Sequence, residues 1–523
     1  MKRINNLLLA SLFASTFLLS GCNQGWKPGK NAIEGAEQPT LKNPKAELSD
    51  LNKIRISQNS FGLPSKGKAN ILVVPITFYG DSLLEGQTGI DLTFNQTDLV
   101  KIKNTYFGEN NVTYPSLSDY YQRSSYGKLT ISGVVTPTIT YKENFLSLID
   151  NITYGTKTVE GVHNEIIDYV YQYLFVTTKT YNLDHFDSNK DGKIDSIQIL
   201  VNYPYGIGVG ESNMDLVMSE FLDYDNIYFS KDISSETPIN SYSVTSELLV
   251  KGAPTNLFAR VPIYQTGLML GLDDYADTTG NQDSIFRATM GRKDMMDGFV
   301  GDHSSFSKYQ LGWITPTLIK ANDIDDDGLT LTLNRFSESG QSIVLYNDTH
   351  SCFDEYLMLD LFSPTGLNSY DDKGENPLGS SLYSLEGLRL THVDARLIRG
   401  YGKSFFPYND ALNFDEEITL SNNEKVKYVY DYRHTNNYLN NYSSYGITSN
   451  NPLCLALSKN ALNRHATSNI ELNDNDLFLQ GDSFGLEGFY KDFTFYEGDG
   501  LGITFEVNKI KDNQATITLR RAK

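Results

Sequence analysis

The stretch from Val261 to Tyr275 constrains the fold more than any other part of this 523-residue chain. Its pattern predicts a short helix that is broken at Gly271 and followed by a tight return carrying Asp273 and Asp274. Positions 264 and 268 are one helical turn apart and therefore share a face. This is the spacing of the HExxHxxGxxD frame, in which two His bind Zn²⁺, the Glu activates a water and the Gly turns the chain toward a third ligand.

The residues that would carry this chemistry are replaced. Tyr264 and Leu268 stand at the two His positions, Gln265 stands at the Glu position, and only Asp274 keeps the identity of a ligand. Leu268 has no lone pair, Tyr264 could bind metal only as a phenolate, and neutral Gln265 cannot take a proton from water. We therefore expect neither zinc nor zinc-dependent hydrolysis at this position.

The N-terminus has the pattern of a secretory signal. Lys2 and Arg3 precede a short apolar run from Leu7 to Leu19, and Leu19-Ser20-Gly21-Cys22 matches the bacterial lipobox. We expect residues 1–21 to be a signal peptide and Cys22 to carry a lipid anchor that holds the protein on the membrane outside the cytoplasm. Residues 22–66 are polar and rich in Asn, Lys, Pro and Gly, which predicts a flexible tether.

The net charge and the cysteine content indicate, less strictly, which partners and which disulfide are possible. The net charge of −20 argues against a nucleic acid or an anionic membrane surface as the partner. The two other cysteines, Cys352 and Cys454, could form one disulfide outside the cytoplasm or remain as two buried thiols. The sequence leaves both alternatives open.

The remaining pattern predicts an α+β protein with two folded parts. An apolar run at Asn70–Phe78 predicts a buried strand, Ser116 an N-cap, and Val159–Phe175 an amphipathic helix. We expect one domain over residues 67–317. From residue 318 to 523 short alternating strands predict a β-rich module, with a sandwich as one arrangement that the pattern permits.

The run from Asp187 to Asp195 has the spacing of a calcium-binding loop. Asp187, Asn189, Asp191 and Asp195 stand at positions 1, 3, 5 and 9 of an EF-hand-type loop, and Gly192 stands at the sharp turn. The bidentate Glu of position 12 is missing, because Gln198 stands there. A calcium site and a solvated acidic turn both remain open at this point.

Several ordered segments of the chain resemble the immune inhibitor A-like secreted bacterial metalloproteases. The segments are S-L-S-D-Y-Y-Q-R-S-S-Y-G-K-L (116–129), D-S-N-K-D-G-K-I-D (187–195), T-G-L-M-L-G-L-D-D-Y (266–275) and D-M-M-D-G-F-V-G-D-H-S-S-F-S-K (294–308). The resemblance implies a zincin-like metalloprotease domain for residues 67–317. It also implies a methionine-containing turn at residues 293–298, beneath the zinc position, and makes calcium plausible in the 187–195 loop.

The first functional hypothesis is a catalytically silent surface lipoprotein that binds an extracellular peptide, protein or glycan. The second is an active metallopeptidase with unorthodox ligands, supported by Asp274, the methionine turn and His303. The third is a carbohydrate-binding protein that uses residues 318–523. We expect His303 to brace the methionine turn rather than to replace a lost ligand.

Overall fold

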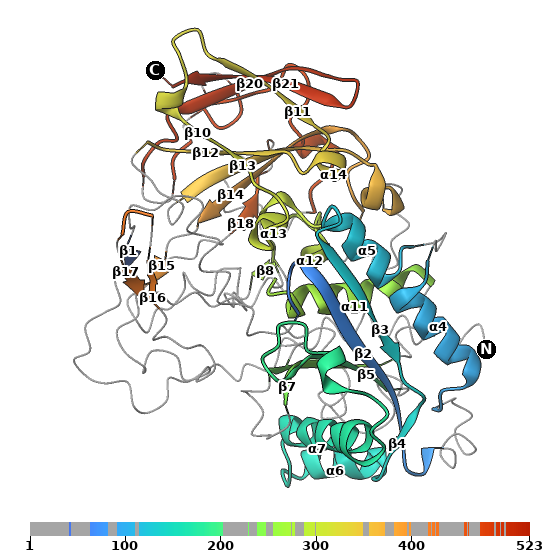
Figure 1. The fold of residues 1–523 in the computed structure, drawn as a ribbon. Helices are drawn as coiled ribbons and strands as arrows, with labels where there is room; N and C mark the ends of the chain where they lie inside the picture. Colours follow the sequence, from blue (N-terminus) through green and yellow to red (C-terminus); the bar gives the residue numbers. More distant parts are fainter. Residues whose placement is uncertain are drawn as a thin grey trace.

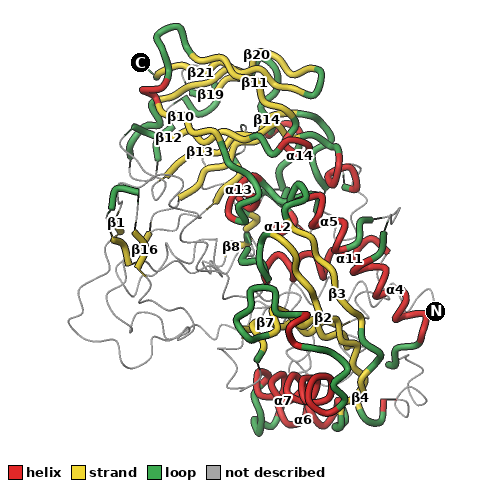
Figure 2. The backbone as a smooth tube through the Cα atoms, in the orientation of Figure 1, coloured by secondary structure: helices red, strands yellow, loops and turns green. Residues whose placement is uncertain are grey.

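We analysed a computed structural model of the chain. It describes residues 41–42, 63–81, 92–109, 114–201, 228–229, 238–246, 255–272, 275–277, 287–298, 300–348, 355–371, 381–394, 397–398, 417–419, 421–423, 425–427, 454–457, 459, 471–485, 488–491, 493–495 and 498–522. The protein has a mixed α/β fold with both parallel and antiparallel sheets (Figures 1 and 2).

The first half is built on a mainly parallel sheet in the order β3-β2-β5-β7-β6, with β4 also paired to β2. All the described pairings in it are parallel except the one between β6 and β7. Its strands are β2 (Gly67–Phe78), β3 (Leu129–Val135), β4 (Ile139–Tyr141), β5 (Ile194–Val201), β6 (Tyr228–Phe229) and β7 (Ile239–Ser246). The strand predicted at Asn70–Phe78 is thus confirmed, with three more residues at its start.

Helices cover both faces of this sheet (Figure 1). Ile71 and Val73 of β2 face one apolar cluster, whereas Leu72 and Val74 face another. Alternate residues of one strand are therefore buried on opposite sides, which explains the continuous apolar run. The helices of the first cluster are α4 (Gln96–Phe107), α5 (Leu117–Ser124) and α11 (Thr255–Met269), and those of the second are α6 (Phe145–Thr153) and α7 (Val159–Tyr171).

Local signals placed two of these helices well. Ser116 caps α5, because its side chain accepts a hydrogen bond from the N–H of Asp119. The helix predicted over Val159–Phe175 is α-helical to Tyr171 and then continues as a π-helix, η2 (Gln172–Thr177). None of the helices in the described ranges is long and apolar enough to cross a membrane.

Two further sheets form most of the second half (Figure 1). One has the order β10-β12-β13-β14-β18, and the other, which is antiparallel throughout, has the order β11-β21-β20-β19. The first contains β10 (Thr317–Lys320), β12 (Ser342–Tyr346), β13 (Glu355–Phe362), β14 (Gly387–Asp394) and β18 (Cys454–Ala456). The second contains β11 (Leu329–Asn334), β19 (Ser483–Phe484), β20 (Ile503–Lys511) and β21 (Gln514–Arg521).

Short elements complete the described structure. Three small antiparallel pairs are β1 (Leu41–Lys42) with β15 (Leu397–Ile398), β8 (Ala276–Asp277) with β9 (Arg287–Ala288), and β16 (Glu417–Thr419) with β17 (Lys425–Lys427). The short helices are η3 (Leu183–His185), α12 (Met295–Gly298), α13 (Ser305–Gln310), η4 (Ala321–Asp323), α14 (Phe336–Ser339), η5 (Gly366–Tyr370) and η8 (Asp474–Asp476).

The five-stranded sheet is buried on both faces and joins the two halves. Leu357 and Leu359 of β13 pack with β20 and β21 in one cluster. Tyr356 and Met358, the alternate residues of the same strand, belong to the cluster that contains α5 and α11. One apolar core therefore crosses the boundary that the sequence predicted between residues 317 and 318.

Close packing of β2 and β3 gives a first testable prediction. Gly133 lies opposite Ile71 in the register, and a Cβ atom at position 133 would overlap the carbonyl oxygen of Ile71. We expect Gly133→Ala to lower the free energy of unfolding by about 1–3 kcal/mol, because the two strands would have to move apart. Urea unfolding measures this loss. Gly500→Ala is the control, because a Cβ atom there meets nothing within 4 Å. Equal losses in the two variants would contradict the prediction.

Candidate functional site

Helix α11 carries the positions of the predicted zinc frame. It begins at Thr255, before the predicted start at Val261, and it contains Pro262. Pro262 lacks the N–H for a helical hydrogen bond, so burial of the surrounding residues, rather than local propensity, favours the longer helix. The chain leaves the helix after Met269 and turns at Gly271, whose φ of +92° favours glycine. The predicted break is confirmed.

The replaced residues are buried in the core of the protein. Tyr264 is 4% exposed, Gln265 1% and Leu268 7%. Tyr264 and Leu268 belong to the apolar cluster that also contains residues of β2, α4 and α5. This face of the helix is filled by side-chain packing and presents almost no surface to solvent.

Hydrogen bonds attach the same helix to the parallel sheet. Gln265 Nε2 donates to Thr245 Oγ1 of β7 at 2.5 Å. Gln198 Nε2 of β5 donates to Thr266 Oγ1 at 3.0 Å. The amide at the general-base position is thus a buried hydrogen-bond donor that holds α11 against β7, and it has no basicity to offer a water.

The segment 293–298, for which the resemblance implied a methionine turn, packs closely against this helix. Helix α12 spans this turn, and a Cβ atom on Gly267 would lie only 2.6 Å from Met296 Sδ. Asp294 shapes the turn, because its carboxylate accepts the N–H of Met296 at 2.7 Å and that of Ser304 at 2.6 Å. Gly267 therefore permits the close approach of the turn to α11.

His303 lies beside this turn among aromatic rings. Its ring centroid is 5.6 Å from that of Tyr120 and 6.0 Å from that of Trp313, and the side chain is fully buried. Its Nδ1 is 3.8 Å from Asp294 Oδ1. Burial raises the pKa of Asp294, but His303 and the N–H donors of Met296 and Ser304 outweigh it, so that the pKa lies below its ordinary value. Neither ring nitrogen of His303 has a hydrogen-bond partner among the described residues, so the bracing role stays a prediction.

The residues present do not fit a zinc ion. Leu268 offers no donor atom, and Gln265 is engaged with Thr245. Asp274, the remaining ligand position, lies outside the described residues. Within the ranges that the structure describes, no group of three or more His, Cys, Asp or Glu side chains is arranged to hold a metal ion. We therefore derive no reaction step through zinc.

The 187–195 loop leads into β5, and its last two residues, Ile194 and Asp195, are the first two residues of that strand. Asp187 accepts the N–H groups of Asp191 at 3.0 Å and Gly192 at 2.9 Å. Asp195 is fully buried at the second residue of β5. The structure thus gathers Asp187, Asn189, Asp191 and Asp195 around one tight turn, as their spacing predicted.

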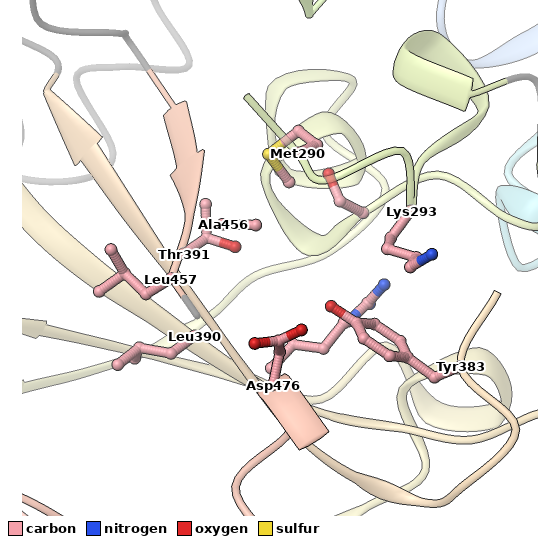
Figure 3. Close-up of a pocket in the computed structure, with 10 residues that line it drawn as sticks. Met290, Lys293, Tyr383, Leu390, Thr391, Ala456, Leu457 and Asp476 are labelled. Atoms are coloured by element: carbon pink, nitrogen blue, oxygen red, sulfur yellow. The ribbon is translucent and has the colours of Figure 1, made fainter. Parts of the chain in front are cut away.

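A small pocket lined by both polar and apolar side chains lies between residues 290–304 and the five-stranded sheet (Figure 3). Lys293 and Arg389 are its cationic residues, with Tyr383, Thr391 and Asp476 beside them. Its free space is close to what a single water molecule needs. Lys293 Nζ lies 3.1 Å from Glu471 Oε1, and Arg389 Nη2 lies 2.8 Å from Asp360 Oδ1. The pocket is too small for a substrate, and both cations already have carboxylate partners.

Burial affects the pKa values of the two cationic residues that line this pocket. Burial lowers the pKa of Lys293 below its ordinary value, although Glu471 acts in the opposite direction. Burial also lowers the pKa of Arg389, but the carboxylate of Asp360 outweighs it and the pKa lies above its ordinary value. The two cations therefore serve to join segments that are distant in sequence.

Sequence reasoning missed two buried ion pairs, one of which connects the two halves. Arg260 of α11 is paired with Asp371, and Lys308 Nζ of α13 lies 2.5 Å from Asp302 Oδ2. Both pairs are almost fully buried. For Arg260 the signal in the sequence is a charged residue within an otherwise apolar segment, which does not reveal its partner.

The structure describes one of the three cysteines. Cys22 and Cys352 lie outside the described residues, as does the predicted tether apart from Leu41–Lys42 and residues 63–66. Cys454 begins β18, where it pairs with Val393 of β14. The lipid anchor and the disulfide remain predictions.

Comparison with known proteins adds no assignment. No family model matches this chain, and no curated protein matches it.

Proposed function

We propose that this protein is a lipid-anchored surface protein built on a zinc-peptidase scaffold that no longer hydrolyses peptides. It acts by binding a peptide, a protein or a glycan outside the cell. The observation that best supports the loss of catalysis concerns Gln265, at the general-base position. Its side chain is 1% exposed, and its amide N–H donates a hydrogen bond to Thr245. A general base must be able to accept a proton from water, and this amide does not.

The zincin scaffold is part of this proposal. Its support is the combination of α11, the Gly271 turn and the Met296 turn that approaches α11 at Gly267. The mainly parallel sheet beside α11 contributes the hydrogen bonds of Gln198 and Thr245 to this helix. Each feature has a structural purpose in the present chain, which explains why the frame persists without its ligands.

A partner would bind to surfaces other than the predicted zinc position on α11. Tyr264, Gln265 and Leu268 are all less than one-tenth exposed, so a partner could not reach them without opening the core. The lipobox that ends at Cys22 supports a location outside the cytoplasm, and the net charge of −20 disfavours polyanionic partners.

Metal content and hydrolysis of the purified protein test this proposal. We expect no stoichiometric zinc after dialysis, and no hydrolysis of a casein or peptide-library substrate when zinc is added. Mass spectrometry of the metals and of the peptide products provides the two measurements. One zinc per chain, together with hydrolysis that is lost in Asp274→Ala, would overturn the proposal.

A further inference from the structure

Several side-chain oxygens of residues 187–195 accept hydrogen bonds from backbone N–H groups of the same loop. Asp187 binds two N–H groups of the loop, Asn189 Oδ1 accepts the N–H of Asp191 at 3.1 Å, and Asp191 Oδ1 accepts the N–H of Lys193 at 2.9 Å. Gly192 has a φ of +86°, which allows the sharp reversal. These bonds alone describe an acidic turn and do not require an ion.

Asp195 supplies the independent observation. Its side chain is fully buried, and its Oδ2 accepts the N–H of Ser188 in the loop at 2.9 Å. Its Oδ1 is also buried and has no hydrogen-bond partner among the residues that the structure describes. A buried carboxylate oxygen without a partner costs free energy, and native proteins provide such groups with a donor, a water or a cation.

The charges of the loop favour a cation over a neutral donor, because hydrogen bonds hold the carboxylates of Asp187, Asp191 and Asp195 at one turn and at the start of β5. Three carboxylates thus repel one another around a partly buried turn. A divalent ion between them would offset this repulsion.

We propose that this loop binds one calcium ion. Oxygens of Asp187, Asn189 and Asp191 would be ligands, Asp195 would contribute directly or through a water, and the Lys193 carbonyl would occupy position 7 of the EF-hand-type pattern. All of these donors are hard oxygen ligands, which suit calcium better than zinc. No three acidic side chains of the described residues, those of this loop included, are arranged to hold an ion by themselves. The proposal therefore requires the Asn189 amide, the Lys193 carbonyl and water to supply part of the coordination shell.

The missing ligand at position 12 sets the expected affinity. Gln198 is directed to α11, where its Nε2 donates to Thr266, and it does not supply a bidentate carboxylate to the loop. A site without that ligand belongs to the weak class, with a dissociation constant of about 10⁻⁴–10⁻³ M, as in extracellular modules.

Calcium at this position would fasten the two strands that hold α11. Asn240 of β7 donates to Asp191 Oδ2 at 2.8 Å, and Ser241 Oγ of β7 donates to the Asp195 carbonyl at 2.9 Å. The same two strands carry Gln198 and Thr245, which bond to α11. The ion would therefore stabilise the parallel sheet at the strands that hold this helix, whether or not the protein binds a partner as proposed above.

Calorimetric titration with calcium chloride tests the site on the metal-free protein. We expect one calcium ion per chain and a higher melting temperature in calcium than in EGTA. Asp187→Asn should weaken calcium binding at least tenfold. Asp326→Asn is the matched control, because Asp326 is exposed in an acidic loop without ligand spacing, and it should leave binding unchanged.

Asp195→Asn separates metal binding from folding. This substitution removes a buried charge whose Oδ1 has no hydrogen-bond partner among the described residues, so we expect a melting temperature in EGTA at least as high as that of the original chain, together with weaker calcium binding. No heat of binding at several millimolar calcium, with equal melting temperatures in calcium and EGTA, would overturn the proposal. Equal calcium affinity in Asp187→Asn, Asp195→Asn and the control would also overturn it.

Discussion

Asp371→Ala should lower the free energy of unfolding by about 3–5 kcal/mol, because it leaves the buried Arg260 guanidinium without its carboxylate. Both side chains are fully buried, and Arg260 Nη1 donates to Asp371 Oδ2 at 3.0 Å. The same carboxylate oxygen accepts the N–H of Gly301 at 2.7 Å. Removing Asp371 therefore takes away the partner of a charge on α11 and that of a backbone donor near α13.

Arg260 cannot escape this loss by losing its proton. Burial lowers the pKa of Arg260, but Tyr114 and Asp371 outweigh it and keep the pKa above its ordinary value. The guanidinium lies 4.1 Å from the centroid of the Tyr114 ring, which helps to hold it in place but offers no hydrogen-bond acceptor for its N–H groups. The buried charge thus remains and must be solvated or exposed when Asp371 is absent.

Denaturant unfolding measures the loss, and two variants control it. Glu338→Ala removes one partner of an exposed ion pair with Arg335 at 3.6 Å and should cost less than about 1 kcal/mol. Combining Arg260→Met with Asp371→Leu removes both charges and should recover much of the stability. A loss below 1 kcal/mol in Asp371→Ala would show that the pair does not hold α11 to the second half.

Local patterns explain which parts of the fold the sequence predicted. The apolar run in β2 faces two cores, the side chain of Ser116 caps α5, and Gly271 ends the segment that contains α11. Each of these features depends on residues within a few positions of one another. The strand alternation in the second half likewise placed β11 and β21, which pair with each other in the four-stranded sheet.

Contacts between distant segments were not predictable in the same way. Arg260 and Asp371 are 111 residues apart, and no periodic pattern relates them. Tyr356 and Met358 alternate with Leu357 and Leu359, which predicts a strand buried on two sides but not that one side faces α5 and α11. The strand patterns were therefore predictable from local sequence, whereas the core shared by the two halves depends on tertiary packing.

In the candidate site, too, local spacing was predictable and contacts between distant residues were not. Spacing placed Tyr264 and Leu268 on one helical turn, whereas the methionine turn near this helix was an expectation from the family resemblance. Spacing did not show that Gln265 would bond to Thr245 or that the three replaced residues would be buried. The helix and the Gly271 turn thus follow the predicted spacing, while the packing role of these three side chains is revealed only by the fold.

Restoring the lost ligands should create a zinc site where none is expected now. The triple substitution Tyr264→His, Gln265→Glu and Leu268→His returns two imidazoles to one face of α11 and a carboxylate between them. We expect one zinc per chain in this variant and none in the original protein. Structural zinc sites contribute about 10–16 kcal/mol of binding free energy, so even a fraction of that value would give stoichiometric binding at micromolar zinc.

Two further variants test zinc binding separately from hydrolysis and test the role of Asp274. Tyr264→His with Leu268→His keeps Gln265 and its hydrogen bond to Thr245, and it should bind zinc without gaining hydrolysis. Adding Asp274→Ala to the triple variant should weaken zinc binding at least tenfold if Asp274 is the third ligand. Circular dichroism and melting temperature establish that each variant is folded. A folded triple variant without zinc would refute the zincin scaffold itself, because helical spacing, the Gly271 turn and the Met296 turn would then have some other origin.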